Sequence, residues 1–190
     1  MHLNVRQNIN AMKQIISHLK FVWYALLVVL IATMFGLTLF NNKALSSVSI
    51  QLKEGQKEHQ DKTIPLVSDP DEKLPDYKVS YLSEDGWQTI GTAVNRSAID
   101  WIEFQISDPP NLALVQGIRI VDEDAVEDDL LEEVQLVDTV PDGVKFDYDI
   151  ETRGSFKAGM AWFASTALGK AVFGAIFLAV FLVFISHIGI

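Results

Sequence analysis

The chain has 190 residues, no cysteine and a formal net charge of −10. This length has room for one domain of ordinary size with accessory segments, and it excludes a second large core. The lack of cysteine excludes disulfides, thiolate metal sites and thiol catalysis. We expect no cofactor, and the acidic balance argues against nucleic acid as a partner.

Charge is distributed unevenly along the chain. All 25 Asp and Glu residues lie between Glu54 and Glu151, and residues 42–157, which also carry 11 Lys and Arg, have a net charge of −14. The first 53 and the last 39 residues contain no acidic side chain. The two ends of the chain therefore differ in kind from its acidic middle.

Residues 1–20 are predicted to form a cytoplasmic amphipathic segment. Apolar side chains recur there at the spacing of one helical stripe: Val5, Ile9, Met12, Ile16 and Leu19. Two placements are open. The segment lies along the inner membrane surface, or it simply extends the first span into the cytoplasm.

Residues 21–40, FVWYALLVVLIATMFGLTLF, are predicted to form a first transmembrane helix. The segment carries no charge, and at about 1.5 Å per residue it spans the roughly 30 Å hydrocarbon core. A signal peptide is the competing interpretation, but its apolar run is usually shorter, and no small-residue cleavage site follows promptly.

Basic side chains near the membrane predict the orientation. Arg6, Lys13 and Lys20 precede the first span, whereas only Lys43 follows it closely. Such side chains accumulate on the cytoplasmic side. We therefore expect both termini in the cytoplasm of a bacterial inner membrane, and the middle of the chain in the periplasm.

Residues 41–157 are predicted to form an extracytoplasmic, acidic, antiparallel β-sandwich of jelly-roll type. Apolar and polar side chains alternate with a period of two, which is typical of strands with one buried and one wet face. Turn residues separate the runs, and residues 54–62, without any apolar side chain, are expected to be an exposed loop. The expected strands lie near residues 47–52, 64–67, 77–81, 87–94, 102–106, 112–121, 134–137 and 144–151.

The stretch QGIRIVDEDAVEDD, residues 116–129, joins a run of alternating apolar residues to an acidic cluster that begins at Asp122. Asp122 and Asp124 begin like a calcium loop, but Val126 stands at the next ligand position and Glu127 stands where the turn requires glycine. The EF-hand interpretation therefore fails. We expect a solvated loop or a single helical turn, pinned by Val126 and Leu130; the alternative is that Asp122 and Asp124 meet a calcium ion or a basic partner surface.

Trp101 is predicted to contact a protein partner or carbohydrate. It is out of phase with the apolar side chains of residues 102–106, so it faces the opposite, wet side of its strand. Trp87 and Tyr148 are expected in the core.

Residues 158–170 are predicted to form an interfacial helix, and residues 171–190 a second transmembrane helix. Lys170, a possible intramembrane charge, is expected to mark the membrane entrance. The alternative is a single long tilted helix with Lys170 inside the bilayer, where an unpaired lysine is costly.

Small side chains recur every fourth residue in this region, at Ala167, Ala171, Ala175 and Ala179. Such a row lets a neighbouring helix approach closely. The partner helix is expected to be either the first span, which offers Gly36, or a helix of another subunit.

The order W-I-x-F, I-R-I-x-D, acidic loop and V-x-L, at residues 101–104, 118–122 and 134–136, resembles galactose-binding-like jelly-roll modules, including those attached to bacterial surface-polysaccharide enzymes. The resemblance implies an eight-stranded sandwich that binds carbohydrate with its rim loops or serves as an assembly module. No sugar-ligating triad is matched, so it implies a fold and no binding residues.

No catalytic constellation stands out, because His59 is the only histidine within residues 41–157, and no nucleophile elbow or phosphate-binding loop is present. The sequence therefore favours a non-catalytic accessory or structural subunit of a larger cell-envelope complex. Its expected partners are the lipid bilayer, other membrane protein subunits and possible carbohydrate ligands. A membrane-anchored carbohydrate- or calcium-binding module and a virion membrane protein are the alternatives.

Overall fold

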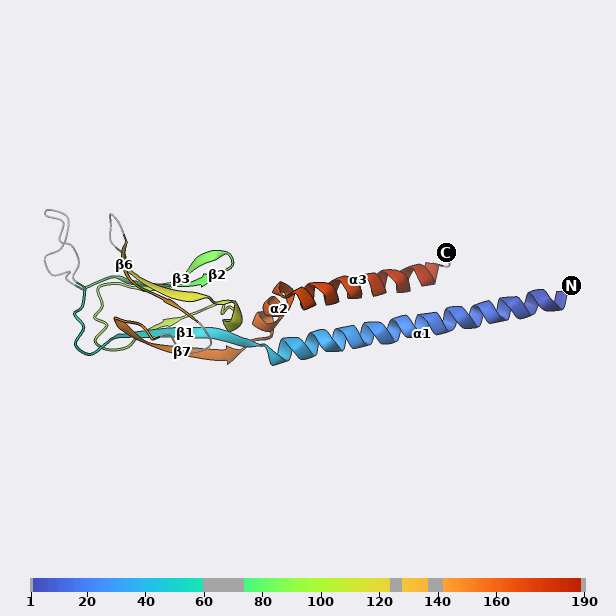
Figure 1. Ribbon diagram of the computed structural model, residues 1–190, viewed down its shortest axis with the longest axis horizontal. Helices are drawn as coiled ribbons and strands as arrows, with labels where there is room; N and C mark the ends of the chain where they lie inside the picture. The colour runs from blue at the N-terminus through green and yellow to red at the C-terminus, as the bar shows by residue number, and fades with distance from the viewer. Residues whose placement is uncertain (1, 60–73, 124–127, 137–141, 189–190) are drawn as a thin grey trace. The chain divides into compact units, whose positions relative to one another are not determined.

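The computed structural model describes residues 2–59, 74–123, 128–136 and 142–188. The chain divides into two compact units (Figure 1). The helical unit consists of residues 1–41 and 159–190, and the β unit consists of residues 42–158.

Two antiparallel sheets make up the β unit, with the strand orders β4-β1-β7 and β3-β2-β5-β6 (Figure 1). The strands are β1 (Lys43–Leu52), β2 (Tyr77–Ser83), β3 (Gly86–Ala93), β4 (Ile102–Gln105), β5 (Gly117–Asp122), β6 (Asp129–Gln135) and β7 (Phe146–Gly154). The first and last strands pair along nearly their whole length, from Lys43 opposite Gly154 to Leu52 opposite Phe146. The chain therefore enters and leaves the β unit at the same end of one sheet.

Side chains from both sheets meet in one hydrophobic core. The three-stranded sheet supplies Val48, Ile50, Phe104 and Phe146, and the four-stranded sheet supplies Tyr77, Val79, Ile118 and Ile120. The rings of Tyr77 and Phe146 meet edge to face, with centroids 5.8 Å apart. Each buried aliphatic or aromatic side chain contributes roughly 1.5 to 3 kcal/mol to folding. Tyr148 is also buried, as expected from the alternation.

The acidic run after β5 differs from the expectation. It was predicted as a loop or a helical turn. Residues 124–127, which include Val126, lie outside the described residues, but Asp129–Gln135 form strand β6, in which Glu133 pairs with Arg119 of β5. Like charges that repel along a helix are tolerated on the wet face of an edge strand. Leu130, expected to pin a helical turn, is 60% exposed.

Two strand boundaries also differ. Leu112–Leu114 form a 3-10 helix instead of a strand, because the Asn111 side chain caps it by accepting a hydrogen bond from the Ala113 N–H. Strand β7 begins at Phe146 and not at Val144, which is 83% exposed. The strand expected at residues 64–67 lies outside the described residues.

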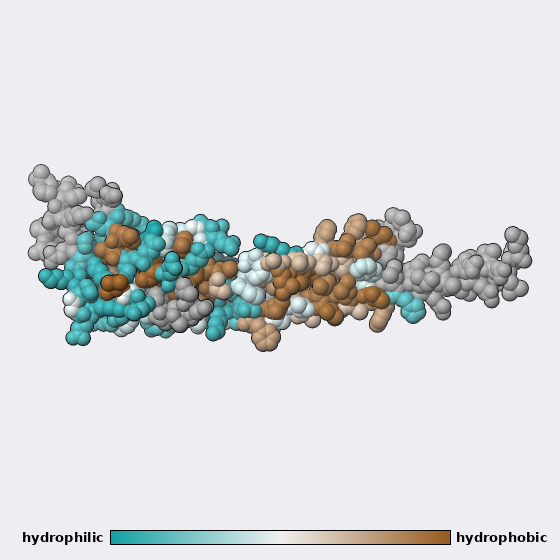
Figure 2. Space-filling view, viewed as in Figure 1, coloured by the Kyte–Doolittle hydropathy of each residue, from teal (hydrophilic) through white to brown (hydrophobic). Residues whose placement is uncertain are grey.

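The helical unit contains α1 (His2–Phe40) and α3 (Ala167–Ile188), which pack against each other; α2 (Phe156–Ser165) leads into α3. Two segments are long and apolar enough to cross a membrane, Lys20–Phe40 and Ala167–Ile185. Figure 2 shows mostly apolar side chains over the coloured part of these helices and mostly hydrophilic side chains over the β unit. Helix α1 runs without a break through residues 2–40.

Thr166 separates α2 from α3. Its side-chain oxygen accepts a 2.9 Å hydrogen bond from the Gly169 N–H, which is the geometry of a helix N-cap. A side chain at Gly169 would collide with the Phe163 carbonyl oxygen, so the close turn requires glycine. The chain is therefore not one long helix here, and the break falls at Thr166 instead of Lys170.

Candidate functional site

Asp122, at the end of β5, is fully buried. Its Oδ1 accepts a 2.8 Å hydrogen bond from the Asp76 N–H, which fixes the chain just before β2. A buried carboxylate needs such donors because desolvation of a charge is costly. In this position Asp122 supports the strand end and does not face the solvent.

His59 lies between two carboxylates of this strand end. Its Nε2 is 3.7 Å from Asp122 Oδ2 and 3.5 Å from Asp129 Oδ2. A protonated imidazole would form ion pairs with both. The loop that contains His59 was expected to be fully exposed, but this side chain is only 30% exposed.

Glu58 ties the same loop to the β unit. Its carboxylate accepts hydrogen bonds from the Tyr77 hydroxyl at 3.2 Å, the Ser97 hydroxyl at 2.9 Å and the Ala98 N–H at 2.6 Å. Burial, with the Glu58 charge beside it, raises the pKa of the Tyr77 hydroxyl, which therefore stays a donor. Sequence reasoning missed this role because a run of polar residues carries no periodic signal.

A second carboxylate cluster is exposed on the strand ends. Lys78 Nζ donates hydrogen bonds to Glu123 at 2.8 Å and to Asp128 at 3.2 Å. The Lys78 hydrogen bond, followed by one from the Thr92 hydroxyl, lowers the pKa of Glu123. This cluster is a surface ion-pair network.

The calcium alternative concerned Asp122 and Asp124, and Asp124 lies outside the described residues. Within residues 2–59, 74–123, 128–136 and 142–188, no three His, Asp or Glu side chains are grouped so that they could hold a metal ion. The buried Asp122 carboxylate accepts a hydrogen bond from the backbone, which is the role of a structural side chain.

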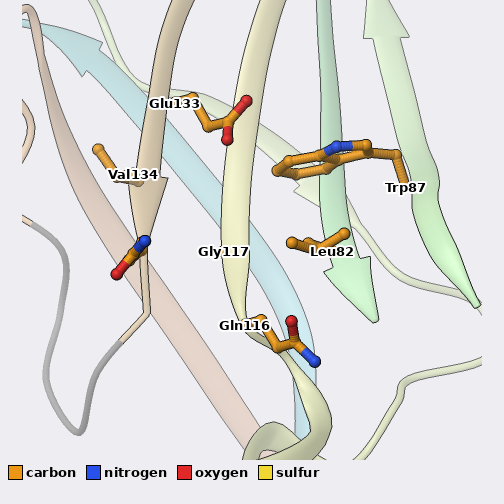
Figure 3. A pocket seen from close by; sticks show the side chains of 7 residues that line it. Leu82, Trp87, Gln116, Gly117, Glu133 and Val134 are labelled. Atoms are coloured by element: carbon orange, nitrogen blue, oxygen red, sulfur yellow. The ribbon is translucent and has the colours of Figure 1, made fainter. Parts of the chain in front are cut away.

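Trp87 lies on the outer face of the four-stranded sheet, so its placement in the core was wrong. It lines a shallow pocket with a volume of about 230 Å³, together with Leu82, Gln116, Gly117, Glu133, Val134 and Gln135 (Figure 3). Arg119 lies over the indole, with its guanidinium carbon 4.0 Å from the ring centroid. No sequence pattern distinguished this face from the core, because both sides of β3 carry apolar residues.

Trp101 immediately precedes β4 and is 49% exposed. This exposure is compatible with a contact residue, and the contact itself stays a prediction. Trp101 is not among the residues that line the pocket beside Trp87.

The alanines spaced by four residues in α3 differ in exposure along the helix. Ala179 is fully buried and Ala175 partly buried, whereas Ala167 and Ala171 are exposed. Gly36 of α1 has open space beside it, and it is Gly159 of α2 whose backbone lies close to Thr38 of α1.

Lys170 is exposed in the first turn of α3. Its backbone N–H donates a 3.0 Å hydrogen bond to the Thr166 carbonyl oxygen. The side chain therefore stands at the beginning of the apolar segment, next to the break between α2 and α3.

The sequence matches no protein-family model and no curated protein.

Proposed function

We propose that this protein is a membrane-anchored, non-catalytic accessory subunit of a larger bacterial cell-envelope complex. Helices α1 and α3 cross the inner membrane, both termini are cytoplasmic, and the β unit is a jelly-roll-like sandwich in the periplasm. The observation that carries the proposal is the exposure of large apolar side chains on both long helices.

These side chains surround the helices instead of forming one buried face. Phe21 of α1 is 73% exposed and Phe177 of α3 is 77% exposed. Only 6% of the apolar segment of α1, Lys20–Phe40, is buried. A core helix of a water-soluble protein would bury such side chains, since exposed apolar patches of this extent are rare on soluble monomers. A bilayer supplies the missing apolar surroundings.

The non-catalytic role is supported by three carboxylates of the β unit that are hydrogen-bonded to the backbone. Glu58, Asp122 and Glu132 each accept hydrogen bonds from backbone N–H groups. Carboxylates committed to the fold in this way serve as structural ties. An acidic β unit on helical anchors suits a subunit that presents a surface to neighbouring proteins.

Membrane topology can be tested by cysteine labelling, because the natural chain has no cysteine. Asp85→Cys in the exposed β2–β3 turn should react with a membrane-impermeant maleimide in intact spheroplasts. His18→Cys in α1 should react only after permeabilisation. The opposite labelling pattern, or recovery of the protein in the soluble fraction, would contradict the proposed topology.

Membership in a complex needs a separate experiment. The tagged full-length chain, extracted from membranes in mild detergent, should elute with a stable companion at a fixed ratio. Elution as a monomer without any companion would contradict the subunit role while leaving the topology intact.

A further inference from the structure

The pocket beside Trp87 lies over a row of residues that includes a glycine. Trp87, Leu82, Gly117 and Gln135 are directly opposite one another on the neighbouring strands β3, β2, β5 and β6. Residues paired in this way direct their side chains to the same face of a sheet. Gly117 has none, and a Cβ there would stand 2.7 Å from the Val134 carbonyl oxygen. Trp87 and Leu82 lie together on one side of Gly117 (Figure 3), and Gln135 also lines the pocket.

One wall of the pocket is aromatic and held in place. In Figure 3 the indole of Trp87 extends from β3 across β2 towards Gly117, with Leu82 beside it. Arg119 lies over this ring at 4.0 Å. Its Nε and Nη2 donate hydrogen bonds of 2.9 Å and 2.7 Å to Glu133, so the guanidinium is itself fixed. A fixed aromatic ring contributes apolar contact at low cost in conformational entropy.

The pocket has no net charge, although the domain is acidic. The positive charge of Arg119 and the negative charge of Glu133 compensate each other at contact distance. An anion would be repelled by the net charge of −14 on residues 42–157. A cation would have to compete with Arg119 for Glu133. The electrostatics therefore favour an uncharged ligand.

Two amides supply polar groups at the pocket. Within the part of the chain that the structure describes, the side chains of Gln116 and Gln135 make no hydrogen bond. The backbone of Gln116 is nevertheless fixed, since its N–H donates to the Leu82 carbonyl and its carbonyl accepts from the Leu136 N–H, both at 2.8 Å. An amide offers donors and an acceptor together, which matches a hydroxyl group.

We propose that this pocket binds one uncharged sugar residue of a glycan. The apolar C–H face of a pyranose packs against Trp87, and its hydroxyl groups bond to the amides of Gln116 and Gln135. A volume of about 230 Å³ is below the roughly 300 to 1,000 Å³ of closed ligand pockets, so a single ring is accommodated and not a chain segment. The site stands on the β unit alone and does not depend on membership in a complex.

The test uses the full-length chain in lipid nanodiscs, because detergents with sugar headgroups would compete for the pocket. The probes are the methyl glycosides of glucose, galactose, mannose and N-acetylglucosamine, with saturation-transfer NMR and tryptophan fluorescence as readouts. At least one probe should bind saturably. Trp87→Ala should weaken that binding at least about tenfold, which is about 1.4 kcal/mol. Ile99→Ala, which changes a 65% exposed side chain outside the pocket, should leave it unchanged.

Gln116→Ala with Gln135→Ala provides a second variant that removes only exposed amides, and circular dichroism confirms its folding. It should also weaken binding about tenfold or more, so the test holds even where Trp87→Ala fails to fold. The proposal is overturned if none of the four glycosides binds saturably. It is equally overturned if the pocket variants bind as the natural chain does, or if Ile99→Ala loses binding to the same extent as they do.

Discussion

Glu132 in β6 accepts a 2.9 Å hydrogen bond from the hydroxyl of Tyr148 in β7, so one side chain links strands of two different sheets. The same carboxylate accepts the N–H groups of Val144, Lys145 and Phe146 at 2.5, 2.8 and 3.1 Å. Burial raises the pKa of the Tyr148 hydroxyl, with the neighbouring Glu132 charge as the next cause. Tyr148 is therefore a protonated donor at neutral pH.

Removing the Glu132 carboxylate should be among the most damaging changes in the β unit. Glu132→Ala leaves four neutral donors without their acceptor, and each buried donor left unsatisfied costs about 1 to 3 kcal/mol. Tyr148→Phe removes one hydrogen bond and should cost about 1 kcal/mol. Urea unfolding of the full chain in detergent, with tryptophan fluorescence as the readout, measures the free energy of unfolding of both variants.

Hydrogen exchange gives a local check on the same carboxylate. The amides of residues 144–146 should exchange faster in Glu132→Ala than in the natural chain, whereas those of β2 should keep their protection. Equal free energies of unfolding for Glu132→Ala and Tyr148→Phe would show that Glu132 is not the tie that its contacts indicate.

The pH dependence of stability should reflect the Lys78–Glu123 pair. Because the pKa of Glu123 is lowered in the folded state, its contribution is complete above the unfolded value of about 4.3 and is lost as the pH falls through the folded pKa. Glu123→Gln should therefore reduce stability at neutral pH and converge with the natural chain in acid. The pair is exposed, so the difference should stay below about 1 kcal/mol and shrink in high salt.

Glu84→Gln, in the exposed β2–β3 turn, is the matched control for this measurement. Its pH profile should follow that of the natural chain. A Glu123→Gln difference that grows towards acid pH would reverse the sign and refute the assignment.

The strands and apolar helices were predictable where the information is local. Alternation identified β2 and β4 close to their observed bounds, whereas β1 begins at Lys43, before the predicted residue 47. Uninterrupted apolar runs identified α3 and the second half of α1. These patterns need only the residues of one element. The helix N-cap at Thr166 was not predicted. It is also a local feature, because the Thr166 side chain accepts a hydrogen bond from the N–H of Gly169, only three residues later.

The sites were less predictable because they depend on register between strands. Glu132 is buried, although the alternation of apolar and polar residues would place a glutamate in solvent. Its burial is explained by the donors that β7, distant in the sequence, offers to its carboxylate. Trp87 was assigned to the core from its apolar character. Its true place follows from the pairing of β3 with β2 and of β2 with β5, which sets it in one row with Gly117.

The close approach of α2 to α1 should depend on Gly159. A Cβ at this position would overlap the carbonyl oxygen of Thr38, a residue that is fully buried and whose hydroxyl lies 3.3 Å from Met160 Sδ. Gly159→Val should therefore destabilise the helical unit by about 1 to 3 kcal/mol, the usual cost of overpacking. Loss of helicity on titration with SDS in mixed micelles measures it.

Gly174→Val is the control for Gly159→Val, because a Cβ at Gly174 in α3 would have open space around it. Both changes place the same β-branched side chain in a helix, so their intrinsic effect on helix propensity cancels in the comparison. Only Gly159→Val should lower the SDS concentration at which helicity is lost. Equal shifts for the two variants would mean that the contact between Gly159 and Thr38 does not hold α2 against α1.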